Sequence, residues 1–302
     1  MTAYERLKRV RVPARYGTVT VFERLKTVKV SNHLDGMTAY EKLKTVRAST
    51  RPTGRDFVEA LFTDRVELCG DRRFADDPAI IGGIGYLGGH AVTYVAIDKG
   101  KDLDERMKKH FGCPMPEGYR KALRLMKQAE KFNRPVICLV DTLGAFCGAD
   151  GEERGQGQAI AENLYEMMGL KTPIISVVLG EGGSGGALAL AVADRVYMLQ
   201  NAVYSVITPD GCASIIWKDA ARVQDAADCL HITAHDMLDF GVAEEIIRED
   251  FENFDRMCSE MKELMLRDLG TLCGLSVPQL LDERYNRFRR IGVYEENGSA
   301  VK

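Results

Sequence analysis

The chain has 302 residues, of which 45% are hydrophobic and 28% are charged, and its formal net charge is −3. This composition is typical of a globular protein and excludes collagen-like and wholly disordered chains. The longest apolar runs fall well short of the roughly 20 residues that a membrane-spanning helix needs, and the N-terminal segment carries charges throughout. We therefore expect neither a transmembrane helix nor a signal peptide.

Eight cysteines are spread along the chain without a Cys-x-x-Cys pair or a metal-binding spacing of histidines. Such a distribution favours neither a zinc site nor a disulfide scaffold. We expect no metal in this chain, and a reduced, cytoplasmic protein.

The charge is uneven, because residues 1–50 carry a net charge of +7 and residues 51–302 carry −10. A basic start can indicate nucleic-acid or membrane binding. Here, however, Lys and Arg alternate with Leu, Val and Tyr at helical spacing and form no solid block. We expect neither a nucleic acid nor a membrane as a partner.

An 18-residue repeat occupies this basic segment. Each unit has an aromatic residue, a leucine three positions later and a valine three positions after that, which places all three on one face of a short helix. The three sets are Tyr4, Leu7 and Val10; Phe22, Leu25 and Val28; and Tyr40, Leu43 and Val46. Such a helix can dock on a neighbour but cannot form a core by itself. We therefore predict an N-terminal extension over residues 1–50 and a domain over residues 51–302 that includes the C-terminal helices.

From residue 51 onward the sequence predicts a turn, then a β-hairpin and then alternating helices and strands. The expected elements are the turn Arg51–Gly54, the strands Ala79–Leu87 and His90–Ile97, the helix Glu117–Phe132, the strand Val136–Asp141, the helix Gln156–Met168, the strand Ile174–Leu179, the helix Gly185–Val192 and the strand Arg195–Leu199. The later strands lack polar alternation, as buried parallel strands do. The fold class is α/β, and the pattern alone leaves a doubly wound sheet and other parallel-sheet folds open.

The strongest local signal is the run Gly180–Ala187, in which five of the eight residues are glycine. It follows a predicted strand and opens a helix of small residues. Glycine lets a ligand oxygen approach backbone N–H groups at a helix N-terminus, where unpaired donors and the helix dipole favour negative charge. The run therefore indicates an anion or oxyanion site, although a tight turn with close helix packing also explains it.

Other chemistry for this run is weaker. As a P-loop it fails, because no Gly-Lys-Ser/Thr follows. As a nucleophile elbow it matches Gly-x-Ser-x-Gly, with Ser184 central and His231 or His235 downstream, but so short a pattern is easily met inside a glycine run. An oxyanion hole needs only the backbone donors, with a small residue at Ser184.

A second glycine-containing loop, Asp141–Gly148, follows the preceding predicted strand. Neighbouring parallel strands end at the same edge of a sheet, so we expect the two loops to form one shared site. Cys147 is a further candidate, as a nucleophile near Glu152 or Glu153, but no motif places a histidine beside it.

Several motifs together are highly specific. They are Arg51-Pro52, Gly70–Arg72 with Ala75–Asp77, Lys99-Gly100, Phe111-Gly112, Pro116–Met126, Glu152–Gln156, Glu181–Ala187, Tyr204–Ile207 and Gly211–Ser214. With these motifs, residues 51–248 resemble the α-subunit family of bacterial acetyl-CoA carboxylase carboxyltransferase. The resemblance implies a crotonase-like fold, which is a spiral of ββα units, with helical N- and C-terminal extensions.

The resemblance also implies a reaction, in which a carboxyl group passes from carboxybiotin on a separate carrier protein to acetyl-CoA and yields malonyl-CoA for fatty acid synthesis. It assigns the oxyanion hole for biotin to the N–H groups of Gly185 and Gly186, with Gly182 and Gly183 shaping the turn. The expected contacts to substrate, CoA or the carrier are Gly144, Ala145, Lys99, Arg120, Lys121 and Arg124. For the four basic residues the alternative is a solvated helix or loop face.

The same resemblance implies partners. A β subunit supplies the CoA half of the active site, the second oxyanion hole and a four-cysteine zinc ribbon, so we expect this chain to be half of an active site in an α2β2 assembly. Biotin carboxyl carrier protein and biotin carboxylase complete the enzyme.

The 141–148 loop departs from the family pattern at Leu143, Phe146 and Cys147, where the family commonly has Pro, Tyr and Pro. The absence of two prolines removes two restraints on the loop. Two other functions stay open. One is a self-sufficient acyl-CoA hydratase or isomerase of the same fold, with Glu152, Glu153 or Glu181 as its carboxylate, and the other is a scaffold or nucleic-acid-binding subunit.

Overall fold

The structure is a computed structural model, and it describes residues 36–292, 294–296 and 299–301. The first two repeat units, and the short helices expected for them, lie outside the described residues.

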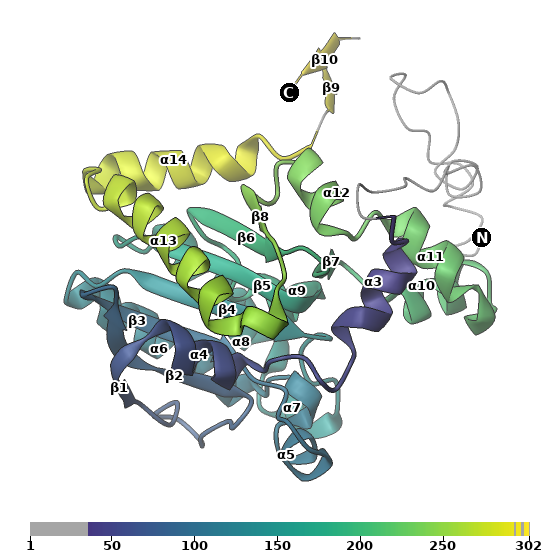
Figure 1. Ribbon diagram of the computed structural model, residues 1–302, viewed down its shortest axis with the longest axis horizontal. Helices are drawn as coiled ribbons and strands as arrows, with labels where there is room; N and C mark the ends of the chain where they lie inside the picture. Colours follow the sequence, from purple (N-terminus) through teal and green to yellow (C-terminus); the bar gives the residue numbers. More distant parts are fainter. Residues whose placement is uncertain (1–35, 293, 297–298, 302) are drawn as a thin grey trace.

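An eight-stranded sheet forms the centre of the fold, in the order β1-β2-β3-β4-β5-β6-β8, with β7 beside β5 (Figure 1). Its strands are β1 Thr63–Glu67, β2 Ile80–Leu87, β3 His90–Ile97, β4 Val136–Thr142, β5 Ile174–Gly183, β6 Arg195–Leu199, β7 Val203–Ser205 and β8 Glu245–Ile247. The first three strands are antiparallel, and every pairing from β3 onward is parallel. Two short strands, β9 Tyr294–Glu296 and β10 Ser299–Val301, pair separately.

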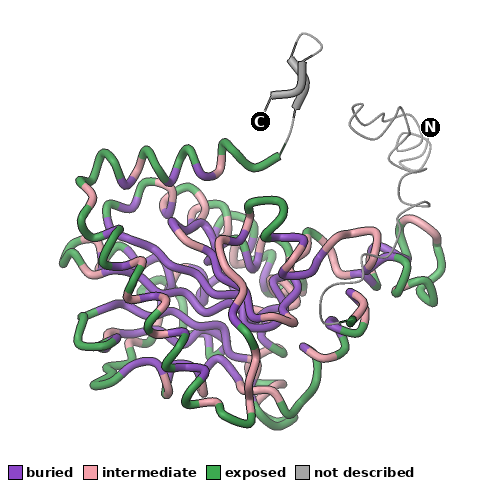
Figure 2. Tube along the Cα trace, turned by 45° about the horizontal axis from the view of Figure 1, so that its top comes forward, coloured by how far each residue is buried: buried purple, intermediate pink, exposed green. Residues whose placement is uncertain are grey.

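Helices enclose this sheet, and α4 and α13 lie in front of it in Figure 1. The α-helices are α3 Ala39–Val46, α4 Gly54–Leu61, α5 Leu103–Lys108, α6 Pro116–Lys131, α7 Ala149–Glu153, α8 Gln156–Gly169, α9 Ser184–Leu188, α10 Pro209–Ile216, α11 Val223–Leu230, α12 Ala234–Asp239, α13 Phe254–Leu272 and α14 Val277–Arg289. Short 3-10 turns lie at His110–Gly112, Ala220–Arg222 and Phe251–Asn253. Figure 2 shows the buried residues concentrated in the strands and the exposed ones on the outer helix faces. Among the residues that the structure describes, no helix has the length and apolar character to cross a membrane.

The predicted hairpin is confirmed as β2 and β3. Leu87 pairs with His90 across Gly88 and Gly89, whose φ angles are 54° and 87°. Glycine adopts this left-handed region without steric cost, as a two-residue hairpin turn requires. The predicted strands and helices that became α6, β4, α8 and β6 are confirmed as well, because their periodicity or apolar run matches their burial.

The glycine run differs from the expectation. The predicted strand ended at Leu179 and the following helix ran to Val192, whereas β5 continues to Gly183 and α9 ends at Leu188. The strand is longer because β7 pairs with its last three residues and supplies backbone partners. The helix is shorter because the next residues form i→i+3 hydrogen bonds, such as Ala191 N–H to the Leu188 carbonyl (3.0 Å).

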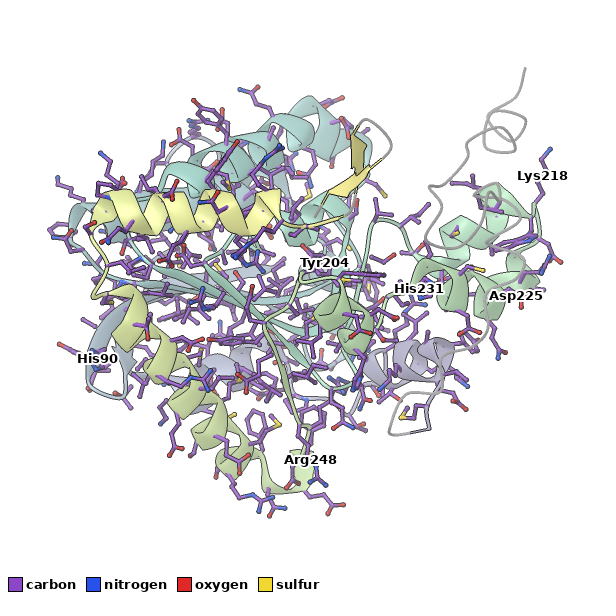
Figure 3. All side chains as sticks on the ribbon, turned by 90° about the horizontal axis from the view of Figure 1, so that it is seen from above. His90, Tyr204, Lys218, Asp225, His231 and Arg248 are labelled. Atoms are coloured by element: carbon purple, nitrogen blue, oxygen red, sulfur yellow. The ribbon has the colours of Figure 1, made fainter. Side chains whose placement is uncertain are left out.

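Helices α3, α10 and α11 form a lobe beside the sheet (Figure 1). Seen from above, Lys218 and Asp225 lie at the outer end of this lobe and Tyr204 lies toward the sheet (Figure 3). For the third repeat unit the expected docking helix is confirmed, since α3 buries Leu43 and Val46 in this lobe. The boundary at residue 50 stays a prediction, and α3, which it places in the extension, packs on residues of the predicted 51–302 domain.

Arg284 ties α14 to the sheet. Its side chain is 0% exposed, and its guanidinium forms two hydrogen bonds of 2.8 Å to the Asp194 carboxylate. It also donates to the carbonyls of Met167, Leu170 and Thr172. A buried charge is tolerated only when it is paired and hydrogen-bonded in this way.

We predict that Arg284→Ala lowers the free energy of unfolding by about 3–5 kcal/mol, because it leaves the buried Asp194 carboxylate without its counter-charge. Urea unfolding measures this change. Arg289→Ala is the matched control, since Arg289 lies exposed on the same helix, and it should shift stability by less than about 0.5 kcal/mol. Equal effects of the two substitutions would contradict the assignment.

Candidate active site

The two glycine-containing loops touch through their backbones. A Cβ atom on Gly183 would lie 1.9 Å from the Leu143 carbonyl oxygen, and one on Gly186 would lie 2.4 Å from the Ala145 nitrogen. Both distances are far below van der Waals contact, so only glycine fits at these positions. The prediction that the loops after β4 and β5 lie together is confirmed.

A shift in strand register brings the loops to this arrangement. The pairing of β4 with β5 is irregular between Val140 and Thr142. At this point Asp141 turns its side chain to β5, and its Oδ1 accepts the N–H of Glu181 (2.8 Å). This hydrogen bond fixes the backbone of Glu181, the residue directly before Gly182.

The turn into α9 exposes backbone donors. Gly183 is the N-cap, Ser184 is exposed with a φ of 53°, and Gly185 is half-buried. The first turn of a helix leaves N–H groups without intrahelical partners. A Cβ on Gly185 would meet only Ile160, at 3.5 Å. The N–H groups of this turn therefore suit an acceptor oxygen that arrives from outside the chain.

Side chains of two helices, α6 and α8, form hydrogen bonds to the backbone of α9 and of the residue that follows it. The buried hydroxyl of Tyr119 donates to the Gly186 carbonyl (3.1 Å), and the buried amide of Asn163 donates to the Ala189 carbonyl (3.2 Å). Burial raises the pKa of Tyr119 well above its usual value, so this hydroxyl keeps its proton. The position of the glycine turn thus depends on side chains from α6 and α8.

A cavity of about 470 Å³ lies beside the glycine strand. Its lining comes from the carboxyl ends of β3, β4 and β5, from the end of α3 and from residues 208–210. Of the ten predicted site residues, Lys99 alone lines it, and the lining also includes Arg47, Asp141, Leu143 and Glu181. The cavity and the exposed turn of α9 are therefore neighbouring but separate features of the site.

A chain of ion pairs crosses this cavity. Lys99 Nζ lies 2.6 Å from Asp141 Oδ1 and 3.5 Å from Glu181 Oε1. Arg47 continues the chain, at 3.0 Å from Glu181 and 3.3 Å from Asp210. Burial alone would lower the pKa of Arg47, but its hydrogen bond and charge attraction to Glu181 raise that pKa above its usual value. Arg47 therefore stays a cation beside the strand that carries the glycines.

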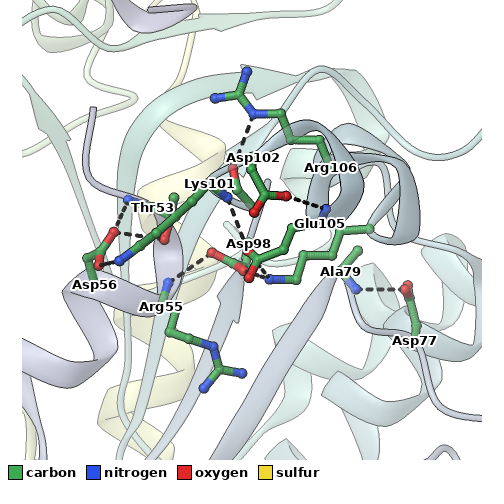
Figure 4. A network of polar contacts seen from close by, with 12 residues as sticks. Thr53, Arg55, Asp56, Asp77, Ala79, Asp98, Lys101, Asp102, Glu105 and Arg106 are labelled. Atoms are coloured by element: carbon green, nitrogen blue, oxygen red, sulfur yellow. Dashed lines mark hydrogen bonds and ion pairs between the residues drawn. The ribbon is translucent and has the colours of Figure 1, made fainter. Parts of the chain in front are cut away.

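A second network of polar contacts is centred on Asp98 (Figure 4). Asp98, the residue before Lys99, accepts the N–H of Arg55 (3.0 Å) and pairs with Lys109 (2.5 Å). The end of β3 is thus tied to the start of α4 and to α5. This anchoring fixes the backbone from which Lys99 reaches the cavity.

Three of the predicted contact residues lie on α6 and contact a loop of this chain. Arg120 pairs with Asp71 (2.7 Å), Lys121 pairs with Asp76 (2.5 Å), and Arg124 donates to the Gly70 carbonyl (3.0 Å). Their cationic groups hold the 69–77 loop against the helix. Their assignment as contacts to CoA or the carrier stays a prediction.

The candidate carboxylates and cysteines have different surroundings. Glu152 and Glu153 are exposed on α7, whereas Glu181 is held by Arg47 and Lys99. Cys147 is exposed. In the part of the chain that the structure describes, no group of three His, Cys, Asp or Glu side chains is placed to hold a metal ion.

One of the two downstream histidines, His231, follows α11 and pairs within its own segment. Its Nδ1 lies 3.3 Å from Asp236 Oδ1. Ser184 is exposed in the glycine turn.

Comparison with known proteins decides the family. A family model described as acetyl co-enzyme A carboxylase carboxyltransferase-like matches residues 8–292. The acetyl-coenzyme A carboxylase carboxyl transferase subunit alpha of Ruminiclostridium cellulolyticum is 53% identical over 238 residues, which cover 79% of this chain and 92% of that protein. The chain belongs to the acetyl-CoA carboxylase carboxyltransferase α-subunit family. The protein of the same name from Clostridium perfringens is 55% identical over 239 residues, covering 78% of this chain and 88% of that one.

Solved structures show the same fold at low sequence identity. The transcarboxylase 12S core, solved with methylmalonyl-coenzyme A bound, superposes with a TM-score of 0.62 at 20% identity. The match covers 76% of this chain and 44% of that chain. The crotonase-like α/β fold expected for this family is therefore confirmed.

Two features of the site were missed by the sequence interpretation. Arg47 was assigned to the extension, although it pairs with Glu181 across 134 positions of sequence. The link from Tyr119 to Gly186 gave no local signal either, since an aromatic residue on an amphipathic helix predicts core packing. The one available hint was that each repeat unit carries a basic residue at this position, as Arg11, Lys29 and Arg47.

The geometry adds a packing requirement at one of the predicted oxyanion-hole glycines. A side chain at Gly186 would meet the backbone at Ala145. We predict that Gly186→Ala destabilises the fold by about 1–3 kcal/mol through overpacking, whereas Gly185→Ala is close to neutral. Melting temperatures of the two variants test this, and equal values would contradict it.

Proposed function

We propose that this chain forms one half of an active site that transfers a carboxyl group from carboxybiotin to acetyl-CoA and yields malonyl-CoA. Family membership supports the reaction class, and the names of the relatives specify acetyl-CoA carboxylase. The observation that carries the proposal is the first turn of α9, where Gly185 is half-buried and has no side chain to cover the backbone, and Gly186 beside it is buried against the 141–148 loop.

The proposed chemistry is electrostatic stabilisation by backbone N–H groups. When bound, carboxybiotin supplies an activated carboxyl group. The N–H groups of Gly185 and Gly186 donate to the ureido oxygen as negative charge develops on it, and donors fixed before the reaction stabilise such charge strongly. Gly182 and Gly183 shape the strand end, and Gly144 and Ala145 form the facing wall. Lys99 supplies positive charge at the cavity.

The proposed assembly contains more than this chain. A β subunit brings the acetyl-CoA half of the site, the second oxyanion hole and a zinc ribbon, in an α2β2 complex. Biotin carboxyl carrier protein delivers carboxybiotin, and biotin carboxylase charges it. We also propose a cytoplasmic location, which the eight free cysteines support.

The comparisons support carboxyl transfer and not the alternative of a self-sufficient hydratase or isomerase. Glu181, the candidate carboxylate on the glycine strand, forms ion pairs with Arg47 at 3.0 Å and with Lys99 at 3.5 Å.

We predict that the isolated chain makes almost no malonyl-CoA and that addition of the β subunit restores carboxyl transfer, because this chain supplies donors for one oxyanion only. The assay measures malonyl-CoA formation from carboxybiotin and acetyl-CoA with each subunit alone and with both. Rapid turnover by the chain alone, as carboxyltransferase or as hydratase, would refute the proposal.

Two neighbouring substitutions separate backbone from side-chain chemistry. Ser184→Ala should retain most of the carboxyl transfer, whereas Gly185→Val should reduce it by about 10²–10³-fold because a branched side chain covers the donors. Both variants should melt close to the parent, since a Cβ at Gly185 makes only an ordinary contact. A large loss for Ser184→Ala with an intact fold would favour a nucleophilic serine.

Tyr119→Phe tests whether support from α6 matters for the reaction. The substitution removes the hydrogen bond to the Gly186 carbonyl and little volume, so we expect kcat to fall up to about tenfold with KM unchanged. Steady-state kinetics with the β subunit measure this split. A melting temperature that falls while kcat stays constant would mean that the hydroxyl serves stability only.

A further inference from the structure

Helix α3 packs its apolar face in a groove between β7 and α11. The groove residues are Val203, Ala227 and Ile232, and we call them the α3 groove. The helix residues buried there are Ala39, Leu43 and Val46. A helix of eight residues is marginal by itself, so its helical form depends on this packing.

Three polar features fix α3 in the groove. Thr38 and Glu41 form a capping box at its start. Lys42 is 0% exposed, and its ammonium donates hydrogen bonds to the turn between β6 and β7. Arg47 follows the helix and pairs with Glu181 (3.0 Å), next to the glycine turn. The groove thus recognises a cap, an apolar stripe, a central cation and a terminal arginine.

The first repeat unit carries the same recognition features at the same spacing. Its residues Thr2, Ala3, Glu5, Leu7, Val10 and Arg11 correspond to Thr38, Ala39, Glu41, Leu43, Val46 and Arg47. Arg6 stands in place of Lys42 and keeps a cation there. Arg9 replaces the half-buried Thr45, at a position outside the buried face of the helix. The cap, the apolar stripe and the terminal arginine are all retained in this copy, and the buried lysine is replaced by another cation.

The second repeat unit is a poorer match. It has Val21 in place of Ala39 and Lys29 in place of Arg47. Ala39 is buried, so the two extra methyl groups of valine would overfill its position. Lysine cannot reproduce the two nitrogen contacts that Arg47 makes with Glu181. These differences select the first unit over the second.

We propose that the α3 groove is a binding site for this repeated sequence, and that residues 2–11 of the same chain occupy it whenever α3 leaves. In the unaltered chain, the length of the link to α4 decides which repeat unit lies in the groove. The link from Arg11 to α4 is roughly seven times longer than the link from Arg47, which disfavours the first unit about 20-fold. The structure accordingly has α3 in the groove.

Exchange of the two units preserves the charge at the site. The first unit ends in Arg11 where α3 ends in Arg47, so either occupant brings a guanidinium to Glu181. The first unit is therefore a reserve occupant that keeps the ion pairs beside the glycine turn. This inference stands on the contacts of α3 and on the repeat, and it does not rest on the proposed function.

Leu43→Asp in the full chain tests the exchange, because a carboxylate at this buried position expels α3 from the groove. Hydrogen exchange measured by mass spectrometry should show that the amides of residues 39–46 lose protection and that those of residues 4–11 gain it. Adding Leu7→Asp should abolish this new protection and lower the melting temperature further. Leu25→Asp is the matched change in the second unit. Added to Leu43→Asp, it should alter neither the amide protection of residues 4–11 nor the melting temperature.

Several outcomes overturn the proposal. Fast exchange at residues 4–11 in a folded Leu43→Asp chain refutes it, and an effect of Leu25→Asp in place of Leu7→Asp refutes the choice of the first unit. Protection that rises with protein concentration identifies a second copy as the donor and refutes exchange within one chain. If Leu43→Asp does not fold, Leu43→Ala gives the same readouts.

A deletion provides the control for the unaltered groove. Removing residues 1–36 should leave the melting temperature and carboxyl transfer with the β subunit unchanged, because α3 already holds the groove. In the Leu43→Asp background the same deletion should lower the melting temperature as much as Leu7→Asp does. A deletion without effect in that background overturns the proposal.

Discussion

The close backbone contact between the glycine strand and the 141–148 loop is the constraint on which the candidate site depends. Gly183 and Gly186 lie where any side chain would collide with the facing loop, at calculated Cβ distances of 1.9 and 2.4 Å. Because the two backbones touch, the start of α9 and the end of β4 are positioned by one contact rather than by two independent loops. Gly185, between them, is spared this constraint, so it is the position where absence of a side chain serves access.

Charge organises the other side of the glycine strand. Glu181 is almost fully buried, and a buried carboxylate is tolerated because Arg47 and Lys99 neutralise it. The two cations come from α3 and from the end of β3, and Asp141 joins the same cluster from β4. Three segments distant in sequence are thereby fixed relative to the glycine turn. The α3 groove belongs to this arrangement, since its occupant supplies one of the two cations.

Because of these two features, the backbone donors and the side-chain carboxylate of the site differ in what they can do. Backbone donors at α9 suit a developing negative charge, whereas the side-chain carboxylate beside them is already committed to ion pairs. An arrangement of this kind suits stabilisation of charge better than acid–base chemistry. The relatives are named as alpha subunits, which indicates a complex of several subunits.

The sequence by itself determined the hairpin, the central strands, α6 and the adjacency of the two glycine loops, because local periodicity, turn residues and parallel strand order are encoded within short segments. It also predicted the glycine turn as the chemical centre. Only the tertiary structure decided that Gly186 is required for packing, that the α6 cations bind the 69–77 loop, and that Arg47 reaches Glu181. Each of these depends on distances between residues far apart in the chain, and such distances are set by how the elements pack together rather than by any local pattern.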